Sequence, residues 1–343
     1  MKRILLFLLI IFLGTSFFFA YKLKTLPEEK PIVLPVKKTL SPTVIPSLVS
    51  KKSIFVPDWS LDGSELTGDY DRWIYFGNNN QLSVFSKLVK SGNKWLTLKL
   101  NEVGEQGDWE NLASDTIANA KKYQMEGIVL DLEINALPFQ DSINEINNLV
   151  GFFYKKTKDS NLKIALALYG DLFYRKRPYD LLFLNKNSDE IMIMAYDFHK
   201  SMGEPGPNFP FFGEKYNYNF QQMINDYLKY VPSEKLTVVF GMYGYDWQVD
   251  EKKRPITQAK ALTLNEIKKK FLNKCEWKNC IIQRNNDAKE TEINYVISRV
   301  VDNYGYIDYH VVWFEDEESV KIKSEFLKEK GIGSTAFWAW GYF

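Results

Sequence analysis

From residue 53 to the end of the chain, short runs of β-branched and aromatic residues alternate with amphipathic segments of helical period. Eight of these runs qualify as strands: Ser53–Val56, Trp73–Phe76, Trp95–Leu100, Ile128–Leu132, Lys163–Leu168, Glu190–Ala195, Leu236–Phe240 and Ser334–Trp338. Eight strands alternating with helices over about 290 residues predict an α/β fold, the (β/α)8 TIM barrel. An open doubly wound sheet is the competing fold, but the glycine-rich phosphate loop after its first strand is missing here.

Two helical segments carry signals for their ends. Ser142 and Glu145 form a capping-box pattern, which predicts a helix start just before the apolar residues that follow. In the segment 318–330, three apolar side chains share one side of the helix, and Gly331 then suits a C-terminal cap. These signals support helices between the strands.

Residues 247–315 break this alternation. They contain charged segments, two cysteines and a β-like run at 309–314. This composition predicts a small α+β insertion after the seventh strand, placed to form one wall of a cleft.

The fourth strand ends in two acidic residues. Alternate side chains of a strand share a face, so Val129, Asp131 and Glu133 point one way. The other face is wholly apolar, with Ile128, Leu130 and Leu132. Burial and like charge both oppose ionisation of such an acid pair, which can keep one carboxyl protonated as a general acid. The alternative is a strand end whose acids cap a helix or pair with surface lysines.

Composition narrows the function classes. The chain has 343 residues, 44 basic against 43 acidic, and a net charge of +1, which offers no footprint for nucleic acid. Its 15% aromatic content suits either a sugar-binding cleft or a thick core. With only His199, His310, Cys275 and Cys280, a metal site built from several His and Cys ligands is not expected.

The N-terminus predicts export. Lys2 and Arg3 precede an apolar run from Ile4 to Ala20, so residues 1–21 are predicted to be a cleaved signal peptide or a membrane anchor. Residues 22–52 are rich in proline and predict an extended linker or stalk, with a disordered tail as the alternative. Residues 53–343 would then be an extracytoplasmic domain, either membrane-anchored or secreted.

An oxidising compartment gives the two cysteines a structural interpretation. Cys275 and Cys280 lie in one short polar stretch, which favours a small local disulfide. Two free thiols are the alternative, and neither interpretation makes these residues catalytic.

Four segments, in order, resemble glycoside hydrolase family 18, the chitinase and N-acetylglucosaminidase family. They are Glu126–Glu133, similar to the pattern D-x-x-D-x-D-x-E; Met194–Asp197, which matches M-x-Y-D; Gly241–Trp247, similar to the seventh-strand region; and Val312–Asp316 followed by Phe337–Gly341. The resemblance covers residues 53–343. The last pairing of segments is most similar to the bacterial cell-wall and spore-cortex peptidoglycan hydrolases of the family.

The resemblance implies a role for each matching residue. In this family the substrate's N-acetyl group is the nucleophile. Glu133 would protonate the glycosidic oxygen and later activate water, and Asp131 would orient the acetamido group. Tyr196 would donate to the acetamido oxygen. The resemblance also implies that Met194, Asp197 and Trp338 bind the substrate. Tyr243 and Trp59 are weaker candidates for the wall of the cleft. The family mechanism needs no metal or organic cofactor.

Two acids of the family pattern are replaced. Glu126 stands for the first Asp and is assigned a structural role, and Val129 stands for the second. Without that second acid, Asp131 must share a proton with Glu133 or stay ionised, so the two are expected to titrate as a coupled pair.

Three functions follow from these observations. The first is a monomeric exported glycosidase that cleaves β-1,4-linked N-acetylglucosamine glycans, with peptidoglycan preferred to chitin. The second is a lectin-like barrel that binds glycan without cleaving it, which the loss of the second Asp would favour. The third is a scaffold that binds partners through residues 247–315.

Overall fold

The computed structural model describes residues 50–301 and 304–343, and all of them belong to one compact unit, residues 47–343. The predicted segment 1–21 and most of the predicted linker 22–52 lie outside the described residues. Within the residues that the structure describes, no helix is long and apolar enough to cross a bilayer.

Eight parallel strands close into a barrel, with β1, β13, β7, β6, β5, β4, β3 and β2 as successive neighbours. Their bounds are β1 Lys51–Pro57, β2 Arg72–Phe76, β3 Asn93–Leu100, β4 Gly127–Leu132, β5 Lys163–Tyr169, β6 Glu190–Ala195, β7 Leu236–Gly241 and β13 Ser334–Trp338. The predicted (β/α)8 barrel is therefore confirmed, and all eight predicted runs lie within its strands.

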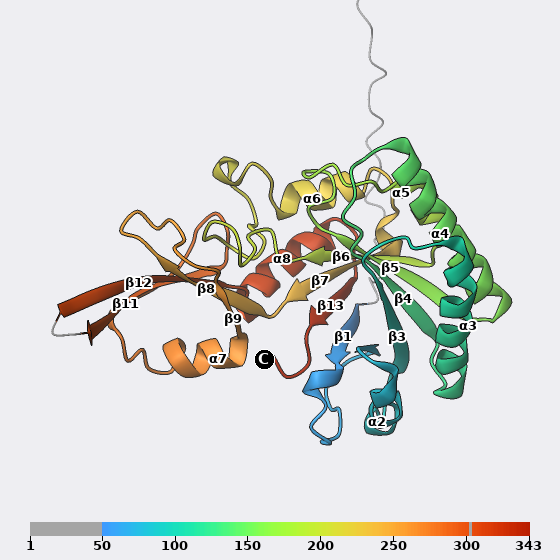
Figure 1. Cartoon of the computed structure of the whole chain (residues 1–343), viewed down its shortest axis with the longest axis horizontal. Coiled ribbons are helices and arrows are strands. Elements are labelled where there is room, and N and C mark those ends of the chain that lie inside the picture. Colours follow the sequence, from blue (N-terminus) through green and yellow to red (C-terminus); the bar gives the residue numbers. More distant parts are fainter. Residues whose placement is uncertain (1–49, 302–303) are drawn as a thin grey trace, which may run out of the picture. The chain divides into compact units, whose positions relative to one another are not determined.

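Helices cover the outer surface of the barrel (Figure 1). They are α2 Leu82–Leu88, α3 Gln106–Lys122, α4 Gln140–Asp159, α5 Leu181–Lys186, α6 Phe220–Tyr227 and α8 Glu317–Glu329. Short 3-10 turns lie at Asp58–Ser60, Asn79–Gln81, Glu214–Tyr216 and Ser233–Lys235. As predicted, α8 is followed by Gly331, whose φ of +78° is a conformation that glycine adopts without strain.

The predicted start of α4 is wrong. The helix begins at Gln140, its N-cap residue is Phe139, and no side chain caps it. The amide of Ile143 already donates to the Phe139 carbonyl oxygen at 3.1 Å. Ser142 and Glu145 are therefore inside the helix, where a capping box cannot form because the Ser142 backbone is already helical.

The alternation along each strand separates two apolar layers. Ile128, Leu130 and Leu132 face outward into the core beneath the helices. The barrel interior is filled by the other row together with its counterparts on neighbouring strands: Phe55, Ile74, Trp95, Val129, Ala165, Ala167, Met192, Val239 and Ala336. The barrel is thus a packed core, and side chains can bind ligands only at its ends.

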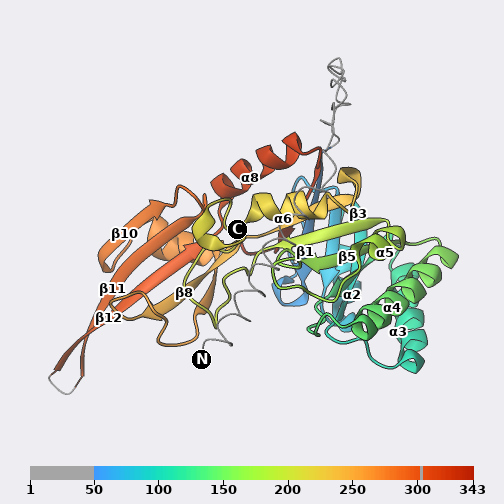
Figure 2. The same ribbon diagram turned by 90° about the horizontal axis from the view of Figure 1, so that it is seen from above.

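A five-stranded antiparallel sheet lies beside the barrel, in the order β10, β11, β12, β8, β9 (Figures 1 and 2). Its strands are β8 Tyr243–Val249, β9 Lys260–Thr263, β10 Lys278–Arg284, β11 Thr291–Val301 and β12 Tyr304–Phe314. The helix α7 Leu264–Ile267 and a π-helical turn, Lys268–Leu272, follow β9. This is the α+β insertion predicted after the seventh strand. A disulfide joins Cys275 to Cys280, with Cα atoms 6.4 Å apart.

Candidate active site

The acidic row of β4 leads from the barrel interior to its rim. Val129 is fully buried, Asp131 is 5% exposed, and Glu133 follows the last residue of the strand with its side chain 32% exposed. The amide of Glu133 donates to the Leu100 carbonyl oxygen of β3 at 3.0 Å, which continues the strand pairing to the rim. One carboxyl is therefore buried and the other reaches solvent.

The electrostatics of Asp131 differ from those of a surface carboxyl. Burial, followed by the negative charge of Glu133, raises the pKa of Asp131 to about 7, although the Lys99 ammonium opposes the shift. Its Oδ1 atom is buried and accepts no hydrogen bond from the residues that the structure describes. A buried acceptor without a donor is costly unless a ligand supplies one.

The end of β6 contributes Met194, Tyr196 and Asp197. Burial and the nearby charge of Asp131 hold the pKa of Tyr196 well above its ordinary value, so its phenol remains a hydrogen-bond donor. The Asp197 carboxylate accepts hydrogen bonds from Tyr243 and, at 2.8 Å, from Tyr245. Asp197 therefore connects the barrel rim to the first strand of the insertion.

Trp338 ends β13 and lies in an aromatic cluster. Its ring centroid is 4.8 Å from that of Phe76, 5.7 Å from Phe55 and 6.2 Å from Trp59. Trp59 is 60% exposed and extends the cluster to the surface of the rim. The two tryptophans offer apolar faces of the kind on which sugar rings pack.

Two hollows meet at Asp197. The larger, of about 330 Å³, is lined on the barrel side by Trp338 and on the insertion side by Tyr243 and Tyr245. The smaller, of about 40 Å³, is lined by Glu133, Tyr169, Gly170, Asp171, Met194, Tyr196, Asp197 and Lys200. Of the predicted residues, these two hollows bring together Glu133, Met194, Tyr196, Asp197, Tyr243 and Trp338. Asp131 is buried next to Glu133, and Trp59 contacts Trp338, but neither lines a hollow. A further hollow of about 430 Å³ lies at the opposite end of the strands, around Arg72 and Glu190, and contains none of them.

Sequence reasoning missed Lys99. Its Nζ atom lies 2.9 Å from Glu133 Oε1, and it comes from the end of β3, where it is the register partner of Asp131. The signal was present: a lysine between Leu98 and Leu100 near the end of a buried strand must point to the barrel opening, because the alternate face is covered by helices.

It also missed Asn208, a buried residue in the loop between β6 and α6. Its Oδ1 accepts from the Asp197 amide at 2.8 Å, and its Nδ2 donates to the Gly241 carbonyl oxygen at 3.1 Å. No local pattern marks this residue, because its partners lie in two other segments of the chain.

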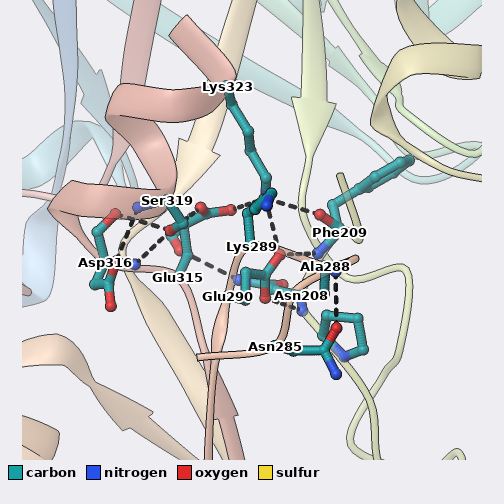
Figure 3. Close-up of polar contacts among 12 residues, drawn as sticks. Asn208, Phe209, Asn285, Ala288, Lys289, Glu290, Glu315, Asp316, Ser319 and Lys323 are labelled. Carbon is teal, nitrogen blue, oxygen red and sulfur yellow. Dashed lines mark hydrogen bonds and ion pairs between the residues drawn. The ribbon is translucent and has the colours of Figure 1, made fainter. Parts of the chain in front are cut away.

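A buried ionic cluster lies behind Asn208 (Figure 3). The Glu290 carboxylate accepts from the amides of Asn208 at 2.5 Å and Phe209 at 2.8 Å, and from Lys323 Nζ at 2.8 Å. Lys323 also contacts Glu315, and all three charged side chains are fully buried. Burial raises the pKa of Glu315 to about 8, with Lys323 opposing the shift. Near neutral pH burial therefore favours the neutral form of Glu315, while Lys323 bonds to both carboxyl groups.

Within the described residues, no group of three or more His, Cys, Asp or Glu side chains is arranged to hold a metal ion.

Barrel, rim carboxyls and aromatic cleft together define the class of this protein as a (β/α)8-barrel glycoside hydrolase. The chain belongs to glycosyl hydrolases family 18, whose family model matches residues 69–342. The resemblance drawn from four sequence motifs is thereby confirmed.

The named relatives share only about a quarter of their aligned residues with this chain. The chain is 24% identical over 234 residues to the glycosylase YvbX of Bacillus subtilis, covering 66% of this chain and 60% of the relative. It is 27% identical over 237 residues to the cortical fragment-lytic enzyme of Bacillus anthracis, covering 66% of this chain and 49% of the relative. It thus spans about half the length of these relatives. Among solved structures, the Group IV chitinase of Ostrinia furnacalis superposes with a TM-score of 0.70 at 16% identity, covering 84% of this chain and 92% of the chitinase.

Proposed function

We propose that this chain is an exported glycosidase that cleaves β-1,4-linked N-acetylglucosamine glycans, with peptidoglycan as the preferred substrate and chitin as the alternative. The observation that carries the proposal is the buried Asp131 next to the rim carboxyl Glu133, because no described residue donates a hydrogen bond to its Oδ1 atom. An acetamido N–H is a donor of the size and polarity that this position needs.

The reaction would begin with proton transfer. Glu133 donates its proton to the glycosidic oxygen, the bond from this oxygen to the anomeric carbon breaks, and the acetamido carbonyl oxygen attacks that carbon. The product is a positively charged oxazolinium ring and a leaving sugar with a new hydroxyl. Glu133, now ionised, takes a proton from water as the water opens the ring, so the configuration is retained and the acid is restored.

Asp131 and Tyr196 would position the nucleophile. Asp131 in its ionised form accepts the acetamido N–H and stabilises the positive charge that develops on the ring. The phenol of Tyr196 donates to the acetamido oxygen. The proposed step needs Asp131 ionised, and because burial raises its pKa to about 7, the acetamido N–H would have to offset that burial when substrate binds.

Substrate class and export rest on further observations. The proteins named above include a cortical fragment-lytic enzyme and a chitinase, and these names support a glycan substrate. The apolar N-terminal run and the disulfide between Cys275 and Cys280 support an oxidising, extracytoplasmic location.

The test is hydrolysis by the full chain of purified peptidoglycan and of chitin oligomers, compared with Glu133→Gln. We expect fragments with a new N-acetylglucosamine reducing end, and a loss of at least about 100-fold in rate for the variant. Binding of either glycan without release of fragments, unchanged by Glu133→Gln, would instead identify a lectin-like barrel.

A further inference from the structure

Strand β9 is an edge strand of the insertion sheet, because it pairs with β8 and with no other described strand. The residues on either side of β9 bond to the barrel. The amide of Ala259 donates to the carbonyl oxygen of Ser201, in the loop after β6, at 2.9 Å. The amide of Asn265 donates to the carbonyl oxygen of Tyr342, after β13, at 2.8 Å. The free edge of β9 therefore faces the end of the barrel.

The hydrogen bonds along β9 determine which backbone groups point to this edge. In an antiparallel pair, residues that bond to the partner strand alternate with residues whose N–H and C=O point away from it. The amide of Leu264 donates to the Met242 carbonyl oxygen at 3.3 Å, in line with the β8–β9 register. The amide of Thr263 instead donates to Glu266 Oε2 at 2.8 Å. Thr263 and, two residues earlier, Ala261 therefore direct their backbone groups away from β8.

Ala261 is the open position of this edge. The outward amides two residues to either side are already bonded, to the Ser201 carbonyl oxygen and to the Glu266 carboxylate. Ala261 is exposed, and among the described residues none outside β8 bonds to its N–H or C=O. Natural sheets usually block or cover such edges. Here one residue offers a donor and an acceptor side by side.

The open position borders the larger hollow of the cleft. Ala261, Leu262 and Thr263 all line this hollow. Because alternate residues of a strand face opposite sides, a hollow that touches three successive residues lies along the edge of the strand rather than over one face. Trp338, whose ring suits the packing of a sugar, lines the same hollow. A glycan on Trp338 would therefore have its substituents beside the edge of β9.

The geometry of Ala261 suits a peptide better than a single amide group. Its N–H and C=O flank one Cα atom and point the same way, so a ligand that bonds to both needs a C=O and an N–H that flank one carbon in the same manner. In a trans acetamido group the N–H and C=O point in opposite directions, so this group can bond to only one of them. An extended amino-acid residue bonds to both, as in peptide recognition by strand addition.

We propose that the edge of β9 at Ala261 binds the stem peptide of peptidoglycan, one residue of which pairs with Ala261 through two hydrogen bonds. The proposal rests on the proposed function and narrows its substrate to glycan strands that still carry their peptides. In peptidoglycan, N-acetylmuramic acid alternates with N-acetylglucosamine, and its lactyl group carries the peptide. A muramic acid next to the sugar on Trp338 therefore brings a peptide into the cleft, whereas chitin has no such group.

The test compares two forms of one polymer. Glycan strands that carry stem peptides, and the same strands after an amidase has removed the peptides, are hydrolysed by the full chain, and kcat/KM is measured for each. We expect wild type to prefer the peptide-bearing strands about 10-fold, in line with two hydrogen bonds. The readout is a ratio within one protein sample, so a partly unfolded variant does not distort it.

Two variants assign the preference to the backbone of Ala261. Proline lacks the N–H and is tolerated on an edge strand where this N–H points away from the partner strand. Ala261→Pro is therefore expected to lower the preference to about threefold or less. Ala261→Ser retains the N–H and should retain the preference, which separates the loss of the donor from the change of side chain.

Hydrogen exchange of the backbone amides gives a second readout that does not require the proline variant to fold. It is measured on Glu133→Gln, with and without a muramyl-peptide fragment of the glycan. The Ala261 amide should exchange at least about fivefold more slowly with the fragment. The Thr263 amide, which already donates to Glu266, should not change.

Each other outcome contradicts a defined part. Equal kcat/KM on both strands, a preference that persists in Ala261→Pro, or unchanged exchange at Ala261 would overturn the peptide site and leave the proposed function intact. Failure of wild type to hydrolyse either strand or chitin oligomers would overturn both.

Discussion

In the acidic row of β4, an apolar side chain stands where the family pattern has a carboxylate. Val129 is fully buried and packs with the interior residues of neighbouring strands. Asp131 therefore has a valine on its own strand where the family pattern has a carboxyl that could share its proton. Because the ionised form of Asp131 is poorly solvated there, its pKa rises to about 7.

Val129→Asp should extend activity to lower pH. The new carboxyl, buried in hydrocarbon, would be protonated and donate a hydrogen bond to ionised Asp131, which lowers the pKa of Asp131. The reaction needs Asp131 ionised, so the acidic limb of the kcat/KM profile should move down by about one pH unit. Val129→Ala, which changes packing without adding a donor, should not move the limb, and an unchanged limb in Val129→Asp would contradict this account.

At the scale of elements, the end of β6 is held by its own loop. Asp197 has a φ of +57°, a left-handed conformation that is unfavourable for a residue with a side chain. The Asn208 side chain stabilises it by accepting the Asp197 amide, and it bonds to the carbonyl oxygens of Gly241 and Tyr243 at the β7–β8 junction. One side chain thus fixes two walls of the cleft relative to each other.

Asn208→Ala should therefore reduce kcat/KM by more than its loss of folded protein can explain. Without the side-chain amide of Asn208, Asp197 and the two tyrosines that bond to it are free to shift. Small displacements of groups that position a substrate reduce kcat/KM by about 10-fold or more. Steady-state kinetics should show the loss at temperatures where circular dichroism reports a folded protein. Asn111→Ala, at an exposed position on α3, is the matched control. Wild-type kinetics in Asn208→Ala would show that the loop needs no such support.

At the scale of the whole domain, the insertion is joined to the barrel by the buried cluster of Glu290, Lys323 and Glu315 (Figure 3). Glu290 follows β10, Lys323 belongs to α8, and Glu290 also bonds to the backbone at Asn208 and Phe209. The support of Asp197 therefore continues through Asn208 into the interface between insertion and barrel.

Lys323→Met should destabilise the domain by about 3–5 kcal/mol near pH 7, because two buried carboxyls lose their cation. The loss should shrink on acidification. Glu315 already has a folded pKa of about 8 against an ordinary 4.5, and without Lys323, which opposes this shift, the pKa of Glu315 rises further. The folded state then binds more protons than the unfolded state from about pH 4.5 upward, so stability increases as pH falls through that range.

Urea unfolding at pH 5 and pH 8 measures this difference. The double variant Glu290→Gln, Lys323→Met should recover part of the loss, since it leaves fewer uncompensated charges. A destabilisation of Lys323→Met that is the same at both pH values would show that the cluster acts through packing rather than charge.

The two ends of the barrel differ in structure: one carries the cleft, and the other carries a buried ion pair. β1 begins at Lys51, and the cleft lies at the opposite, C-terminal ends of the strands. The N-terminal end is closed by Arg72, whose guanidinium bonds to both Glu190 oxygens at 2.7 Å and lies 4.7 Å from the centroid of the Trp95 ring. Lys51, where β1 begins, therefore lies at the end of the barrel away from the cleft.

Local patterns in the sequence were enough to predict three features: the strands of the barrel, the face of β4 that carries Asp131 and Glu133, and the protein family. These features depend on local periodicity: a strand repeats every two residues, so the composition of one run settles which side chains face inward. The same local patterns marked Tyr196 and Trp338, because each ends a recognisable strand.

The contacts that these residues make are seen only in the folded domain. Lys99 meets Glu133 because β3 and β4 are neighbours in register. Asn208 accepts a hydrogen bond from the Asp197 amide across 11 residues of its own loop, and Glu290 bonds to the Asn208 backbone from 82 residues away. The start of α4 at Gln140, with Phe139 as its N-cap residue, was likewise not indicated by the capping pattern, which begins three residues after Phe139. Closure of the barrel and docking of the insertion bring distant residues together, and the free energy of those contacts depends on burial and on neighbouring charge, neither of which is encoded by local periodicity.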